Sequence, residues 1–397
     1  MSPRSSSHDR TGDQGPILCG RLAPRRAGTP REWIELDVET AASTLGQQWR
    51  RLNEAPEAPP TGDPTWQVAY WRAFPTEGSS PCVHALRVGE ELSAVLPLRR
   101  SGRFVQRWSS GANAHTPYCA LGFGQSPQVA AGALEHLMAS VQMLDLGPLY
   151  ARRAETDALA RAARERGFRV SQDARGADAV IDLPASWSGL QRSLGAKLVG
   201  NTSRRLRHLR ELGRLEFEVV TGGALPQILT ECFALETLGW KGTRGAPISS
   251  RPDTLQFYSE LAEASAADGR LALYILRLNS ALIAFEYCLR HNGRIDLLKE
   301  SYHPDFSRYS PGSVLRLLLL QREIESGEAR SYHMGRLSGW KAGWANRREP
   351  LCQLRVYRAG LRGTIAYLVN SWIPGRARQQ PAIRAAGRWL LGRLRIA

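Results

Sequence analysis

The stretch from Tyr302 to Ser313, YHPDFSRYSPGS, places hydroxyls, a guanidinium and a glycine directly before an apolar helical pattern. Ser310 suits a helix N-cap, and Pro311 suits the first helical position, where a missing N–H has no partner to lose. Gly312 adds no side chain, so free main-chain amides and the positive helix end face any ligand. These residue types predict an anion site. The alternative is an ordinary capped helix whose amides are bonded to water.

The flanking elements must hold this loop in place. The segment after it is apolar on too many faces for a surface helix, which predicts a helix packed against a sheet and ended by Gly327. Its apolar residues are Val314, Leu315, Leu317, Leu318, Leu319 and Leu320. Gly293 to Tyr302 has a strand pattern, so a strand, an anion loop and a buried helix follow one another, as in phosphate-cradling turns.

Composition limits the function classes. The 397 residues allow two domains, and 53 basic against 37 acidic residues give a net charge of +16, which favours an anionic partner. That partner can be a nucleic acid, a membrane face or a phosphorylated metabolite. The six cysteines form no CxxC pair, which indicates no zinc site or disulfide framework and favours a reducing cytoplasm. No apolar run approaches the ~20 residues that cross a bilayer. Residues 1–31 are expected to be a disordered leader.

Residues 32–189 predict a first α/β domain. Helices are expected over Thr44–Ala55, Thr65–Phe74, Val129–Ser140 and Ala154–Gly167, a hairpin over Cys82–Arg100, and strands near Arg103–Ser109 and Met143–Leu149. The polar loop Ser109–Ala120 can line a cleft or serve as a plain connection.

A basic helix is predicted next, over Leu194–Leu215, with a cap at Thr202 or Ser203. Arginines recur on one of its faces and leucines on the other: Arg204, Arg207 and Arg210 against Leu206, Leu209 and Leu212. The basic face either contacts phosphates of a cofactor or nucleic acid, or is simply solvated.

The second domain, residues 190–360, shows an ordered series of elements. The pattern predicts a strand (Leu215–Val220), two helices (Ala224–Trp240 and Asp253–Gly269), three strands (Arg270–Asn279, Ser280–His291 and Arg294–Tyr302), the anion loop with its helix, and strands near Ala329–Met334 and Gln353–Arg358.

This order resembles the Gcn5-related N-acetyltransferase (GNAT) fold. Specific segments are similar to the CelD-like (BioF2-like) branch associated with cellulose biosynthesis, itself related to the Fem peptidyltransferases. They are the Arg-rich helix Ser203–Leu212, ETLGWKG (Glu236–Gly242), the strand block ending in LLKESY, the SPG of Ser310–Gly312, and Trp340-Lys341. The resemblance implies two tandem acetyltransferase-like domains, the first one degenerate.

The resemblance also implies an acyl-CoA co-substrate, acetyl-CoA or another acyl-CoA. The sequence contains no metal-ligand spacing, so no metal is predicted. The acyl-CoA pyrophosphate would be held by Arg308, Ser310, Gly312 and Ser313. Glu300, at the end of the entering strand, would deprotonate an amine or hydroxyl acceptor, or else form an ordinary salt bridge with Lys299 or an arginine. Glu286 lies in the apolar run AFEYCL and is the second candidate base, because burial would raise its pKa.

Two aromatic-lysine pairs, Trp240-Lys241 and Trp340-Lys341, suit a sugar or phosphorylated acceptor, although tryptophans are more often core residues. His303 and His115 are further acid/base candidates. Members of the CelD-like branch often carry an acid shortly before the second pair, where this chain has His333 and Gly335.

The tail, residues 361–397, has seven arginines and no acid, with apolar residues at helical spacing. It can lie on an anionic membrane face or pack on the first domain. The sequence thus predicts a cytoplasmic acyltransferase, with peripheral contact at the inner membrane face through this tail, that acts on a carbohydrate or cell-envelope precursor. The alternatives are a Fem-like transferase that uses aminoacyl-tRNA and a non-catalytic scaffold with the same fold.

Overall fold

The computed structural model describes residues 31–76, 81–123, 126–223, 225–239 and 247–373. Its strands are β1 (Arg31–Leu36), β2 (Pro81–Val88), β3 (Glu91–Ser101), β4 (Arg107–Ser110), β5 (Met143–Tyr150), β6 (Arg169–Asp182), β7 (Leu215–Val220), β8 (Leu271–Leu278), β9 (Ala281–His291), β10 (Arg294–Tyr302), β11 (Ser331–Arg336) and β12 (Arg347–Tyr357).

The α-helices are α1 (Val38–Leu52), α2 (Pro64–Ala73), α3 (Pro127–Ser140), α4 (Ala154–Glu165), α5 (Trp187–Leu194), α6 (Ala196–Glu211), α7 (Leu225–Leu238), α9 (Pro252–Ala267), α10 (Pro311–Ser326), α11 (Lys341–Trp344) and α12 (Leu361–Tyr367). Shorter helical turns are η1 (Pro60–Gly62), η2 (Ile248–Ser250), η3 (Pro304–Tyr309) and η4 (Leu368–Trp372). The fold is mixed α/β, as predicted.

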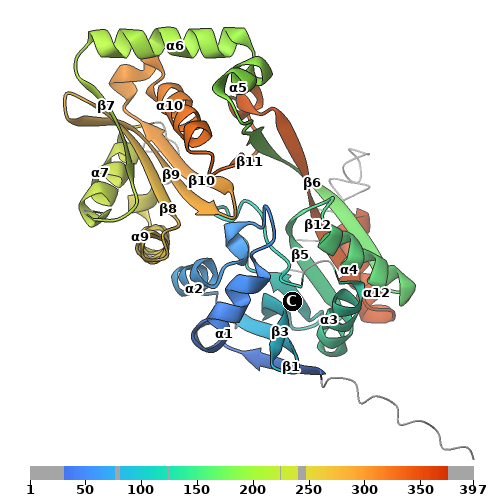
Figure 1. The fold of residues 1–397 in the computed structure, drawn as a ribbon. Coiled ribbons are helices and arrows are strands. Elements are labelled where there is room, and N and C mark those ends of the chain that lie inside the picture. The colour runs from blue at the N-terminus through green and yellow to red at the C-terminus, as the bar shows by residue number, and fades with distance from the viewer. Residues whose placement is uncertain (1–30, 77–80, 124–125, 224, 240–246, 374–397) are drawn as a thin grey trace, which may run out of the picture.

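All strands join one twelve-stranded sheet in the order β1-β2-β3-β4-β5-β12-β6-β11-β10-β9-β8-β7. Strands β1 to β5 follow one another from one edge of the sheet, and β7 to β11 follow one another from the other edge. At the centre the two series exchange their last strands, because β12 pairs with β5 and β6 pairs with β11. We call β1–β5 with β12 the first half, and β7–β11 with β6 the second half. The paired strands β6 and β12 extend from one half of the molecule into the other (Figure 1).

Three large apolar clusters cover the sheet. On one face, α1 and α2 of the first half and α7 and α9 of the second half share a single cluster, joined where α2 packs on α9. On the other face each half has its own cluster, under α3 and α4 in the first and under α10 in the second. Fully burying a leucine contributes about 1.5–3 kcal/mol, so α10, with most of its leucines buried, is firmly anchored.

Most predicted elements form where the periodicity placed them. The Cys82–Arg100 hairpin, the three strands before the anion loop and the helix ended by Gly327 are confirmed. The cap at Thr202 or Ser203 is wrong: α6 begins at Ala196 with Gly195 as its N-cap, and the Thr202 hydroxyl bonds back to the Leu198 carbonyl. The sequence patterns gave no expectation of the long strand β6 or of α5.

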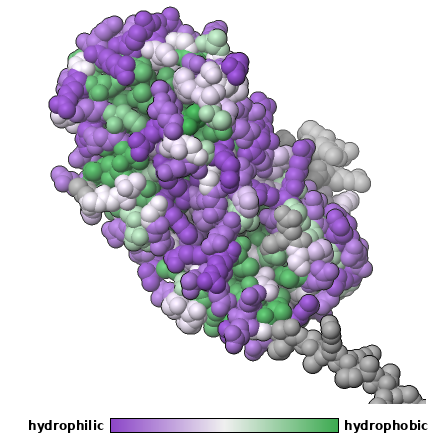
Figure 2. All heavy atoms as spheres, viewed as in Figure 1, coloured by the Kyte–Doolittle hydropathy of each residue, from purple (hydrophilic) through white to green (hydrophobic). Residues whose placement is uncertain are grey.

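Hydrophilic residues cover most of the face shown in Figure 2, including the junction between the halves. Within the described ranges no helix combines the length and apolarity that a membrane span needs. Of the predicted tail, residues 361–397, the first part forms α12 and η4, and residues 374–397 lie outside the described residues.

Candidate active site

In the second half, β10 and β11 pair along only part of their length. These parallel strands are in register only from Arg294–Ser331 to Asp296–His333, whereas β10 continues along β9 to Tyr302. A register shift between Leu297 and Lys299 marks the point of divergence. Bulges of this kind redirect side chains beside active sites. The last residues of β10 therefore offer main-chain groups on the side facing away from β9.

The predicted anion loop lies at the start of α10, but its details differ from the prediction. Ser310 occupies the N-cap position in the left-handed conformation (φ +47°), and its side chain makes no capping bond. The Ser313 amide donates to the Ser310 carbonyl at 2.9 Å, so it is already bonded. In the first turn of α10, the Gly312 amide donates to no acceptor among the described residues. Arg308 is exposed and its guanidinium lies 4.6 Å from the Tyr309 ring centre.

Both predicted carboxylates meet at one buried arginine. Glu286 and Glu300 are direct partners in the β9–β10 register, so their side chains share a face of the sheet. Arg316 of α10 donates from Nη2 to Glu286 Oε1 and to Glu300 Oε2, the latter at 2.6 Å. Tyr332 of β11 donates its hydroxyl to Glu286 Oε2. We call Glu286, Glu300, Arg316 and Tyr332 the carboxylate cluster.

The cluster separates the two carboxylates by environment. Glu286 is fully buried, and burial, opposed by Arg316 and assisted by Glu300, raises its pKa to about 7. Burial opposes the charge on Arg316, but the two glutamates outweigh it and raise the arginine pKa. The Glu300 side chain keeps 30% of its surface exposed. Glu300 is therefore in contact with solvent, whereas Glu286 is buried and holds the arginine that both glutamates share.

Aromatic rings close one side of the cluster. The Arg316 guanidinium lies 4.0 Å from the Trp340 ring centre and 5.5 Å from that of Trp344. Trp340 is 42% exposed, and the Lys341 ammonium also lies 5.6 Å from its ring centre. The Lys341 ammonium donates to the Met334 carbonyl of β11. The other predicted pair, Trp240 and Lys241, lies outside the described residues.

The opposite face of β10 carries a second set of polar groups. Lys299 precedes Glu300 and therefore faces the other way, with its ammonium 5.1 Å from the Tyr258 ring centre. The Tyr258 hydroxyl lies 3.3 Å from His115 Nδ1 of the first half. Burial, helped by Lys299, lowers the pKa of His115 to about 4, so the imidazole is neutral at pH 7.

The other two histidines have structural partners. His333 is buried, with Nδ1 2.6 Å from Asp178 and Nε2 3.1 Å from the Ser331 hydroxyl, and burial lowers its pKa to about 4. It belongs to a network that joins the halves, in which Tyr150 donates to Asp178 and accepts from Arg294. His303 accepts from the Asp305 amide at 3.4 Å and so caps η3.

Sequence reasoning missed Arg316, Tyr332 and Trp344. A signal for the first was present, because Arg316 is the one charged residue in the run VLRLLLL. A guanidinium on a helix that is apolar on every side must be buried with a carboxylate partner. Tyr332 and Trp344 carry no comparable signal, since buried aromatic residues are common in any core.

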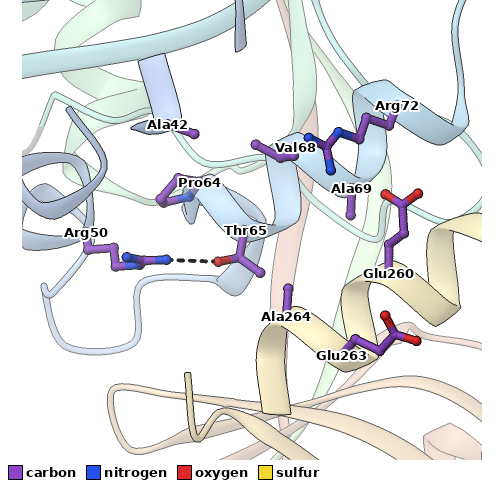
Figure 3. Close-up of a pocket in the computed structure, with 10 residues that line it drawn as sticks. All are labelled: Ala42, Arg50, Pro64, Thr65, Val68, Ala69, Arg72, Glu260, Glu263 and Ala264. Carbon is purple, nitrogen blue, oxygen red and sulfur yellow. Dashed lines mark hydrogen bonds between the residues drawn. The ribbon is translucent and has the colours of Figure 1, made fainter. Parts of the chain in front are cut away.

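The pocket of about 370 Å³ shown in Figure 3 lies away from the carboxylate cluster. Side chains of α1, α2 and α9 line it, among them Arg50, Arg72, Glu260 and Glu263. None of its ten lining residues belongs to the predicted site. It is a surface groove where helices of the two halves meet.

In the first half, other segments of the chain occupy the equivalent position. There β4 ends at Ser110, and the Val95 amide of β3 bonds instead to the Gly122 carbonyl at 2.6 Å. The Cys119 amide donates to the Pro148 carbonyl of β5 at 2.6 Å. The void left between these elements is about 10 Å³, room for no more than one water molecule.

The fold is similar to that of known proteins. Residues 196–342 match the model of the acetyltransferase (GNAT) domain family, so the second half contains an acyltransferase domain. The crystal structure of FemX superposes with a TM-score of 0.57 at 11% identity, covering 85% of this chain and 99% of that one. A conserved protein of unknown function from Bacteroides thetaiotaomicron superposes with a TM-score of 0.50 at 13% identity, covering 82% and 99%. No curated protein is significantly similar in sequence.

Proposed function

We propose that the chain transfers an acyl group from acyl-CoA to an amine or hydroxyl of a carbohydrate or cell-envelope precursor. The observation that carries the proposal is the end of β10–β11 pairing after Asp296 and His333, together with the unbonded Gly312 amide at the start of α10. A diphosphate suits the positive helix end, and an extended amide-containing arm suits the open edge of a strand.

The chain's own groups can carry out the transfer. The acceptor nitrogen or oxygen attacks the thioester carbonyl, forms the new C–N or C–O bond and loses its proton to Glu300, directly or through one water. The C–S bond breaks and CoA leaves as a thiolate. Arg316 fixes the position of Glu300 through Oε2, and positioning of the two reactants supplies much of the rate enhancement.

The acceptor class rests on two features. The exposed part of the Trp340 indole, beside the Arg316 guanidinium, offers an apolar surface against which a sugar ring can pack. The resemblance to CelD-like proteins supports the same class.

The test is calorimetric titration with acetyl-CoA and longer acyl-CoAs, using a matched pair of variants. Gly312 is the second residue of α10, and Gln128 is the second residue of α3, which also begins with proline. A Cβ at Gly312 would meet only Tyr302 Cδ1, at 3.7 Å, and an acid at a helix N-terminus favours the helix, so Gly312→Asp should fold.

We expect Gly312→Asp to bind acyl-CoA at least tenfold more weakly, about 1.4 kcal/mol, and Gln128→Asp to bind like the parent protein. Equal affinity in all three proteins would remove the proposed site.

A Fem-like transfer from aminoacyl-tRNA is the second candidate. Its support is α6, which packs on α10 and η3 and exposes Arg204, Arg207 and Arg210. Binding of tRNA that weakens steeply with salt, in a protein that binds no acyl-CoA, would favour this candidate. Loss of that binding in Arg204→Ala with Arg207→Ala would assign it to α6.

A further inference from the structure

Three side chains far apart in the sequence meet in the first half, well away from the carboxylate cluster. Glu35 lies on β1, His84 on β2 and His136 on α3. His84 Nδ1 lies 3.1 Å from His136 Nε2, and Glu35 Oε1 lies 3.4 Å from the first nitrogen and 3.5 Å from the second. These three atoms form a nearly equilateral triangle.

The size of the triangle distinguishes two explanations. A charge-assisted hydrogen bond between a carboxylate and an imidazole is about 2.7–2.9 Å long, so 3.4 and 3.5 Å are too long. Ligand atoms around tetrahedral Zn²⁺ lie about 2.0–2.2 Å from the metal, which places them roughly 3.4 Å from one another. The two edges to Glu35 match the second arrangement, whereas the 3.1 Å edge between His84 and His136 is also the length of an ordinary hydrogen bond.

We propose that Glu35, His84 and His136 bind a divalent transition-metal ion, with Zn²⁺ as the ion that the nitrogen and oxygen donors fit best. Three protein ligands leave a fourth tetrahedral position, which water would take. Sequence motifs for metal sites place their ligands a few residues apart, whereas these three residues are 49 and 52 positions apart. The sequence therefore does not predict this site.

The surrounding structure holds each ligand in place. Glu35 and His84 are direct partners in the β1–β2 register, and the Trp33 ring stacks on His136 at 4.4 Å between centres and 6° between planes. His84 is buried and contacts the Trp108 ring edge to face at 4.4 Å.

Metal binding would fasten the edge of the sheet. Among the described residues, β1 pairs only with β2, so a single ladder holds this strand there. A metal ion bound by residues of β1, β2 and α3 would link the edge strand β1 to helix α3, which covers the apolar cluster of the first half. The ion would stabilise the folded chain by binding it and not the unfolded chain.

The experiment uses the full chain without a histidine tag, stripped with a chelator and titrated with Zn²⁺ against a chromogenic chelator. One ion per chain is expected. Glu35→Gln and His136→Gln should each weaken binding at least tenfold, while His208→Gln, on the exposed face of α6, should not. Zn²⁺ should raise the melting temperature of the parent and of His208→Gln but not of His136→Gln, and Co²⁺ should give the visible spectrum of a four-coordinate site.

Circular dichroism of the stripped variants will show that they are folded. Failure of the folded parent chain to bind one Zn²⁺, or equal binding by all four proteins, would overturn the proposal. The affinity of the protein for acyl-CoA should not change when zinc is removed. Acyl-CoA titration of the stripped protein therefore tests the two proposed sites independently.

Discussion

The two halves of the sheet can be compared position by position, and they differ most where the second half carries charge. The hairpins β2–β3 and β8–β9 have a register shift at the same point, so Glu286 corresponds to Leu96. Counted from the first proline of α3 and α10, Arg316 corresponds to Gly132. The second residue of β11, Tyr332, corresponds to Leu144 of β5.

Glu300 has no counterpart, because β4 ends before it reaches the corresponding position along β3. One half thus places a buried ion pair and an open strand edge where the other places leucine, glycine and a folded-in segment. Buried ion pairs add little stability compared with apolar residues of similar volume. The comparison therefore assigns stability to the first half and chemistry to the second.

The largest expected effect is that of Arg316→Met. The change leaves Glu286 buried and Glu300 half-buried without their shared cation, and breaking a buried pair typically costs about 3–5 kcal/mol. Chemical denaturation measures the loss. Adding Glu286→Leu, which imitates Leu96, should recover part of the stability but no activity. A single variant as stable as the parent would mean that the pair is not buried in solution.

Glu300→Gln should lower kcat by about 100-fold, since general bases contribute at least that much, and leave KM nearly unchanged. The amide can still accept from Arg316, so the fold should be retained. Steady-state kinetics with the acyl acceptor measures both constants. Glu91→Gln, at the exposed start of β3, is the control and should behave like the parent. Equal kcat values for Glu300→Gln and the parent would exclude Glu300 as the base.

Local patterns predicted the elements of both halves well but predicted the relation between them poorly. The strand, anion loop and buried helix around Ser310 follow from capping residues and periodicity, which act over a few positions. The left-handed Ser310, whose carbonyl accepts from the Ser313 amide, depends on how η3 enters α10. The exchange of β6 and β12 depends on pairing between strands more than 160 residues apart, which no local pattern records.

The pH dependence of stability should reveal Glu286. Its folded-state pKa is raised from 4.5 to about 7, so between these values the folded chain binds more protons than the unfolded chain. This group therefore stabilises the fold fully below pH 4.5, and its contribution is lost as the pH rises through 7. His115 and His333, whose pKa values burial lowers from 6.5 to about 4, also make the stability of the fold depend on pH. The difference in unfolding free energy between the parent and Glu286→Gln, measured from pH 5 to 8, isolates the effect; a constant difference would contradict it.

The smallest effect is expected from Gly132→Ala in α3. No atom lies within 4 Å of a Cβ built at Gly132, and alanine is more favourable than glycine in a helix by about 0.8–1.0 kcal/mol. The variant should therefore be more stable by up to that amount, with unchanged kcat and KM, because this position has no role in the chemistry if the first half is a scaffold. Denaturation and kinetics on the same preparation check both parts. A gain in stability accompanied by a loss of kcat would show that motion within the first half contributes to turnover, and the division of roles between the halves would fail.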